Sequence, residues 1–138
     1  MVRRSRYHFR RGTTACKNLA FSARRLAWLR DNEPENYRNI RWVFECKDYV
    51  RFRLTGEAFA EVTDYSGTNL MNLHTRDYDP RLLGLFGLEA VAAALPPLRL
   101  STDVCGRITE EAAALTGLKA GTPVVGGMFD IDACAGAV

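Results

Sequence analysis

The sequence predicts an α/β domain, because helical patterns and short apolar runs alternate along the chain. Residues 17–32 carry apolar side chains at helical spacing, and residues 109–118 begin with a threonine cap and two glutamates and reach a glycine stop. Residues 122–127 have the sequence TPVVGG, an apolar run that predicts a buried strand and two glycines that bring the backbone close to another group.

The first half of the chain is predicted to contain two long helices and a strand. Residues 17–32 form the first helix, which ends shortly before a proline. A short helical turn then passes into a strand at 42–44. Residues 46–56 form the second helix, and Gly56 is a good residue to end it.

The second half continues the alternation. Residues 63–69, TDYSGTN, predict a turn, because their side chains readily form hydrogen bonds to nearby backbone. Residues 70–75 predict a strand, and residues 79–88 predict a helix with Asp79 as its N-cap and a proline at the first helical position. Residues 95–108 contain two prolines and then an extended stretch.

Composition is that of one globular domain. The chain has 138 residues, of which 47% are apolar and 25% charged, and no apolar run reaches the roughly 18 residues that a membrane span needs. Four scattered cysteines and two histidines lack the spacing of a metal site, so no metal ligand is predicted. Scattered cysteines without a secretory signal favour a cytoplasmic protein with no membrane partner.

The net charge of +3 comes from one end of the chain. Five of the 19 basic residues are arginines among the first 11 residues, which leaves 14 basic against 16 acidic residues in the rest. We expect residues 1–13 to be a disordered basic head. A nucleic-acid partner is not predicted, because such proteins usually spread their basic side chains over one face of a folded domain.

One carboxylate follows the last predicted strand. Asp130 stands just past the two glycines, where open α/β sheets bind their ligands, and an ionised carboxylate there can accept a proton from a hydroxyl. The simpler interpretation is that Asp130 or Asp132 is only the N-cap of a last helix, expected to begin at about Asp132. Spacing alone favours the simpler interpretation.

Four segments, in order, resemble the FGGY family of carbohydrate kinases, which belong to the actin-like ATPase superfamily. They are FSARRLAWLRDN (21–32), KDYVRFRLTGE (47–57), TDYSGTNLMNLHTRDYDPRLLGLFGL (63–88) and CGRITEEAAALTGLKAGTPVVGGMFDIDACA (105–135). The resemblance implies that residues 14–138 are a partial actin-like (ribonuclease H-like) ATPase domain, the second half of the family's N-terminal domain, and that residues 1–13 lie outside it.

The resemblance also implies a function. The family's V-x-G-x-x-D pattern falls on Val125, Gly127 and Asp130, which makes Asp130 both the catalytic base and a substrate contact of an alcohol-group phosphotransferase. The complete family enzymes use ATP and Mg²⁺, are often dimers, and phosphorylate a sugar or polyol. Most of the elements that bind ATP have no counterpart here, so no cofactor-binding residue is assigned and the isolated chain is expected to be inactive.

The substrate follows from a finer resemblance. LPPLRLSTDVCGRIT (95–109) and GTPVVGGMFD (121–130), with Phe129 before the aspartate, are most similar to L-xylulose/3-keto-L-gulonate kinases, which implies an L-xylulose-like ketose. Erythritol-type kinases are nearly as similar. The alternative function is that of a small protein that binds a sugar or a partner without catalysis.

Overall fold

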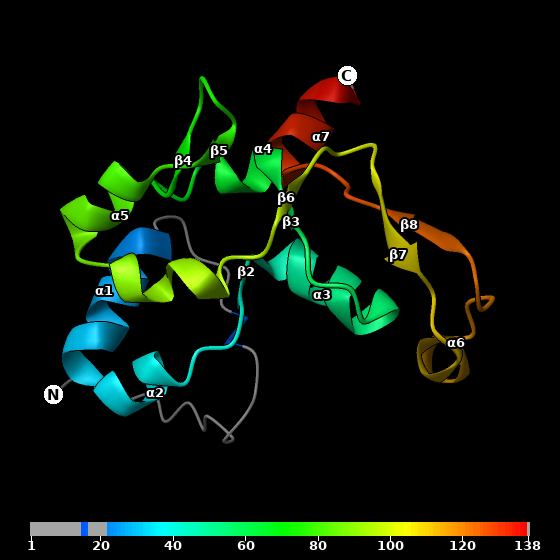
Figure 1. The fold of residues 1–138 in the computed structure, drawn as a ribbon. Coiled ribbons are helices and arrows are strands. Elements are labelled where there is room, and N and C mark those ends of the chain that lie inside the picture. Colours follow the sequence, from blue (N-terminus) through cyan, green and yellow to red (C-terminus); the bar gives the residue numbers. More distant parts are fainter. Residues whose placement is uncertain (1–14, 17–21, 138) are drawn as a thin grey trace, which may run out of the picture.

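The computed structural model describes residues 15–16 and 22–137. The expected basic head at 1–13 and the start of the first predicted helix, at 17–21, lie outside these residues. Within them helices alternate with short strands, so the predicted α/β class is confirmed (Figure 1).

The described strands form four separate pairs. Two pairs are parallel and two are antiparallel. The parallel pairs are β1 (Ala15–Cys16) with β2 (Val43–Phe44), and β3 (Ala60–Glu61) with β6 (Leu98–Arg99); the antiparallel pairs are β4 (Met71–Asn72) with β5 (Asp77–Tyr78), and β7 (Val104–Arg107) with β8 (Pro123–Val125).

The last strand, β8, is not the buried strand that its sequence predicts. Its only partner in the described part of the chain is the antiparallel β7, and Val125 remains 50% exposed. A strand in such a two-stranded ribbon covers little apolar surface, whatever its side chains.

Seven α-helices and one 3₁₀-helix lie in the described residues. They are α1 (Ser22–Asn32), α2 (Pro34–Arg38), α3 (Cys46–Thr55), α4 (Val62–Tyr65), α5 (Pro80–Phe86), the 3₁₀-helix η1 (Glu89–Ala94), α6 (Glu110–Thr116) and α7 (Asp130–Gly136). The short α4 replaces the first part of the turn predicted at 63–69, and α7 begins two residues before the predicted Asp132.

The predicted helix ends are confirmed where local side-chain chemistry sets them. The Asp79 carboxylate accepts the backbone N–H of Arg81, and the Thr109 hydroxyl accepts that of Ala112. Gly56 ends α3 with φ = 75°, a left-handed conformation that favours glycine.

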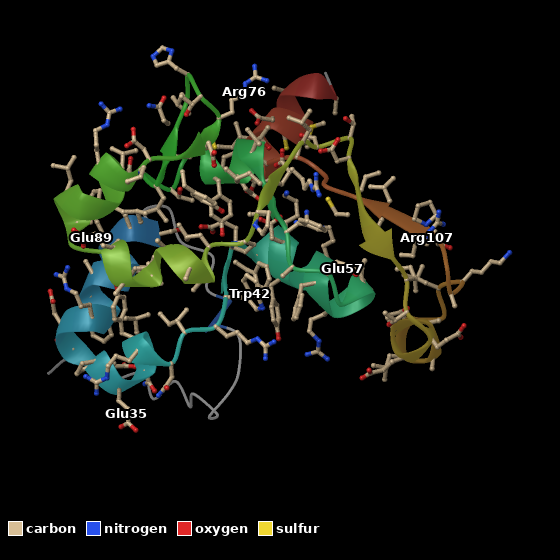
Figure 2. All side chains as sticks on the ribbon, in the orientation of Figure 1. Glu35, Trp42, Glu57, Arg76, Glu89 and Arg107 are labelled. Carbon is tan, nitrogen blue, oxygen red and sulfur yellow. The ribbon has the colours of Figure 1, made fainter. Side chains whose placement is uncertain are left out.

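The main apolar core lies between α1, α2, α5 and η1. Its buried side chains come from residues 23–95: Ala23, Leu26, Tyr37, Val43, Leu70, Leu83, Leu88, Val91, Ala94 and Leu95. Figure 2 shows Glu35 and Glu89 on this helical group, and Arg107 far from it on the β7–β8 ribbon. In the described part of the chain, no helix is long and apolar enough to cross a membrane.

Candidate functional site

Asp130 is the first residue of α7, and its side chain is exposed. The N-cap of α7 is Phe129, so neither Asp130 nor Asp132 occupies the cap position that the simpler interpretation gives them. One Asp130 carboxylate oxygen accepts the N–H of Ile131 at 2.8 Å. The carboxylate thus satisfies one free backbone donor of the first turn while staying open to solvent.

Two glycines bring the backbone before Asp130 against the turn at residues 100–103. The N–H groups of Gly126 and Gly127 donate to the carbonyls of Asp103 and Ser101, each at 2.9 Å. A Cβ on Gly126 would collide with the carbonyl oxygen of Leu100, and Gly127 has φ = 70°. The group that the glycine pair approaches is therefore this chain's own backbone.

Below this backbone lies a set of ion-paired side chains from α3, β3 and α4, which we call the charged cluster (Lys47, Asp48, Arg51, Glu61 and Asp64). The Lys47 ammonium lies 3.2 Å from a carboxylate oxygen of Glu61, 3.2 Å from one of Asp64 and 3.3 Å from one of Asp48. The Arg51 guanidinium lies 3.0 Å from a carboxylate oxygen of Asp48. Asp48 and Glu61 have no exposed surface.

Both cations of the charged cluster also reach the segment that leads to Asp130. The carbonyl of Gly126 accepts hydrogen bonds from Lys47 at 3.1 Å and from Arg51 at 2.7 Å. Arg51 donates further to the carbonyl of Phe59 at 2.6 Å. Hydrogen bonds from charged donors are stronger than neutral ones, so this carbonyl is held firmly.

Glu61 connects the charged cluster to α4 and to the turn at 100–103. Its carboxylate accepts the N–H groups of Thr63 and Asp64, the Thr63 hydroxyl at 2.5 Å and the Ser101 hydroxyl at 2.8 Å. Burial alone would raise the pKa of Glu61, but the hydrogen bonds from Thr63 and Ser101 and the charge of Lys47 outweigh it and lower that pKa.

The other two acids of the charged cluster shift the opposite way. Burial raises the pKa of Asp48 and that of Asp64, although Lys47 opposes both shifts. The charge of Asp130 also raises the pKa of Asp64, so these two carboxyl groups interact.

Thr63 holds the other end of the segment. Its hydroxyl oxygen accepts the backbone N–H of Phe129, the residue directly before Asp130, at 2.8 Å. The segment Gly126–Asp130 is therefore tied to α3 at its start and to α4 at its end.

Sequence reasoning identified Asp130 but gave the charged cluster no chemical role. Its residues lie in the segments 47–57 and 63–88, or beside them, and these segments entered only as resemblances. One signal was available, because Asp48 and Arg51 are opposite charges three residues apart on a predicted helix. The hydrogen bond from Lys47 to Gly126 had no such signal, since the two residues are 79 positions apart in the sequence.

The acidic side chains of the charged cluster are paired with side-chain cations. In residues 15–16 and 22–137 no group of three or more His, Cys, Asp or Glu side chains is placed to hold a metal ion. Lys47 lies within ion-pair distance of all three carboxylates of the charged cluster, and Arg51 pairs with Asp48.

Comparison with known proteins gives a family match over nearly the whole chain. Residues 4–136 match the model of the N-terminal domain of the FGGY family of carbohydrate kinases. The match begins at residue 4, inside the segment 1–13 that the sequence analysis placed outside the family domain. The chain is 48% identical over 106 residues to a probable L-xylulose kinase of Pasteurella multocida and to the L-xylulose/3-keto-L-gulonate kinase of Escherichia coli (strain K12). These alignments cover 77% of this chain but 22% and 21% of the relatives, so the chain spans about a fifth of the length of these curated relatives.

Solved structures of carbohydrate kinases have a fold similar to that of this chain. The crystal structure of xylulose kinase from Rhodospirillum rubrum matches 83% of this chain and 24% of its own chain, with a TM-score of 0.76 and 32% identity. Glycerol kinase from Plasmodium falciparum matches with a TM-score of 0.73 at 23% identity, which is a likeness of fold.

Proposed function

We propose that this chain, which belongs to the FGGY family of carbohydrate kinases, forms part of a kinase domain that phosphorylates a sugar or polyol, with Asp130 as the proton acceptor. Family members are phosphotransferases that act on carbohydrates. One observation carries the role of Asp130: its carboxylate is exposed, while the backbone segment that leads to it is hydrogen-bonded at both ends to partly buried side chains, Lys47 and Thr63.

The chemistry required of Asp130 is simple. A sugar hydroxyl donates a hydrogen bond to the carboxylate, which takes up the proton as the hydroxyl oxygen attacks the terminal phosphate of the donor. Phosphoryl transfer depends chiefly on positioning and on neutralising charge, and the base orients the attacking oxygen. The exposed carboxylate can meet a substrate without a rearrangement of the core.

The family implies ATP and Mg²⁺ as the donor and its metal. The described residues do not fit a metal site of their own, because the acids near Asp130 are neutralised by Lys47 and Arg51. No step of nucleotide or metal binding is therefore assigned to these residues. Since the chain spans about a fifth of its curated relatives, we expect no kinase activity from it alone.

An L-xylulose-like ketose is the proposed substrate. The support is the 48% identity to two relatives that are named as L-xylulose kinases, against 36% to an autoinducer-2 kinase of Enterobacter sp. (strain 638). A panel with L-xylulose, 3-keto-L-gulonate and glycerol tests this choice by comparing kcat/KM for each, measured with the grafted kinase described in the next paragraph. Glycerol as the best substrate would contradict it.

The experiment for Asp130 uses a complete kinase. In what we call the grafted kinase, residues 22–137 of this chain replace the corresponding residues of the E. coli L-xylulose/3-keto-L-gulonate kinase. Asp130→Asn should lower sugar-dependent ADP release by about 10²–10⁴-fold, because the amide cannot take up the proton. Sugar binding, measured by calorimetry, should survive, since the amide oxygen still accepts a hydrogen bond. Full turnover by the variant would end the assignment.

A further inference from the structure

We propose that Lys47 and Thr63 are positioning residues, which hold the backbone segment Gly126–Asp130 and thereby keep the Asp130 carboxylate in place for proton transfer. This inference rests on the proposed function of Asp130. It gives a role to the segments KDYVRF and TDY, which sequence reasoning left without one.

The first tie is at Gly126. Its carbonyl oxygen accepts from both Lys47 and Arg51, so both of its lone pairs meet a cation. Gly126 is buried, and no larger residue fits there because a Cβ would collide with the carbonyl of Leu100. The orientation of this peptide group is therefore determined by packing and by charge together.

The second tie is at Phe129. The Thr63 hydroxyl accepts the Phe129 N–H at 2.8 Å and donates its own proton to Glu61 at 2.5 Å. Glu61 in turn is ion-paired with Lys47 at 3.2 Å. The two ties thus belong to one connected network, and this network ends directly before Asp130.

Apolar burial does not provide an alternative anchor for the segment. Met128 is 47% exposed and Ile131, directly after Asp130, is 66% exposed. Asp130 itself is exposed. Phe129 is half-buried, and the N–H groups of Gly126 and Gly127 bond to the turn at 100–103, so the side-chain ties act together with these backbone contacts in fixing the carboxylate.

Amide hydrogen exchange on the full chain tests the ties directly. Lys47→Met and Thr63→Val should speed exchange at residues 126–131 by about tenfold or more, because each removes a hydrogen bond that holds this segment. Thr63→Ser retains the hydroxyl and should exchange like the wild type. Lys119→Met, which removes an exposed lysine from the turn after α6, is the matched control and should also leave the segment unchanged.

Thr63→Val decides the outcome if Lys47→Met fails to fold, because valine has nearly the shape of threonine and leaves the ion pairs in place. Wild-type exchange at 126–131 in Thr63→Val would overturn the proposal. So would an equal acceleration at residues 104–107, since that would mean a general loss of stability and no specific tie.

Turnover separates positioning from stability alone. In the grafted kinase, Thr63→Val should lower kcat by roughly 10- to 100-fold and change the KM for the sugar by less than about threefold, and Thr63→Ser should restore kcat. Wild-type kcat in Thr63→Val would overturn the positioning role while an inactive Asp130→Asn still upheld the proposed function. A fully active Asp130→Asn would instead remove the proposed function, and this inference with it.

Discussion

Two regions of this molecule are held together by different forces. In residues 22–95, the helices α1, α2, α5 and η1 bury a shared apolar core. Residues 100–137 bury few apolar side chains (Cys105, Ile108 and Ala112) and expose seven large ones by 47% to 74%: Leu100, Val104, Leu115, Leu118, Val125, Met128 and Ile131. Figure 1 shows this second region as the β7–β8 ribbon with α6 and α7 at its two ends.

The difference explains how an exposed carboxylate can have a defined position. Apolar burial is not directional, and it stabilises the first region as a whole. The segment before Asp130 is held by hydrogen bonds with Lys47, Arg51 and Thr63, which do fix direction. The region that carries the candidate base therefore depends on polar contacts to its neighbour for its geometry.

The largest expected effect on stability concerns the apolar core of the first region, residues 22–95. Leu88 has no exposed surface, so Leu88→Ala should lower the free energy of unfolding by about 2–5 kcal/mol. Leu115 is 74% exposed, and Leu115→Ala should change it by no more than about 0.5 kcal/mol. Urea unfolding followed by circular dichroism measures both. Equal losses would mean that the second region has an apolar core of its own.

A smaller effect is expected from Glu45, a buried residue of the first region directly before α3. Burial raises the pKa of Glu45 from 4.5 to about 7; the hydrogen bond from Ser22 and the charge of Arg25 lower it, and Asp64 and Asp48 raise it further. The folded state therefore binds a proton between about pH 4.5 and 7 that the unfolded state lacks. Stability from this group is lost as the pH rises through 7.

The matched variant is Glu45→Gln, which resembles the protonated side chain. The wild type should lose up to about 3 kcal/mol more than Glu45→Gln between pH 5 and pH 8, as measured by urea unfolding at each pH. Asp48 and Asp64 titrate in both proteins, so their contributions largely cancel. The same pH dependence in both proteins would show that Glu45 is not the group responsible.

The smallest effect concerns the second region's own local contacts. The Thr109 hydroxyl accepts the N–H of Ala112 at 3.1 Å and caps α6. Thr109→Ala should destabilise the chain by about 1 kcal/mol, whereas Thr109→Ser should be nearly neutral. Thermal unfolding compares the two. A neutral alanine variant would mean that α6 frays without consequence for the rest.

The sequence predicted those features that neighbouring residues determine. Asp79 and Thr109 cap their helices as expected, and Gly56 ends α3, because each acts within one helical turn. The short α4 was missed, since the residue that caps it is a glutamate, Glu61, whose side chain is fixed by the distant Ser101.

In the candidate site, too, the sequence predicted some features and missed those that depend on residues far apart in the chain. Asp130 was predicted as a site residue from its position after a glycine pair and from a family pattern, and its role stays a prediction. The burial predicted for β8 was wrong, because it depended on strands beside it and the described partner is one antiparallel strand. The tie from Lys47 to Gly126 joins residues far apart in the chain, and no local pattern could predict it.

Proton acceptance by one exposed aspartate can be tested against its neighbour on the same helix. Asp130 and Asp132 both lie in the first turn of α7, and both are exposed. In the grafted kinase, Asp130→Asn should lower the single-turnover rate of phosphoryl transfer by at least about 10²-fold, and Asp132→Asn should leave it within about threefold of the wild type. Equal rates for the two variants would contradict the account.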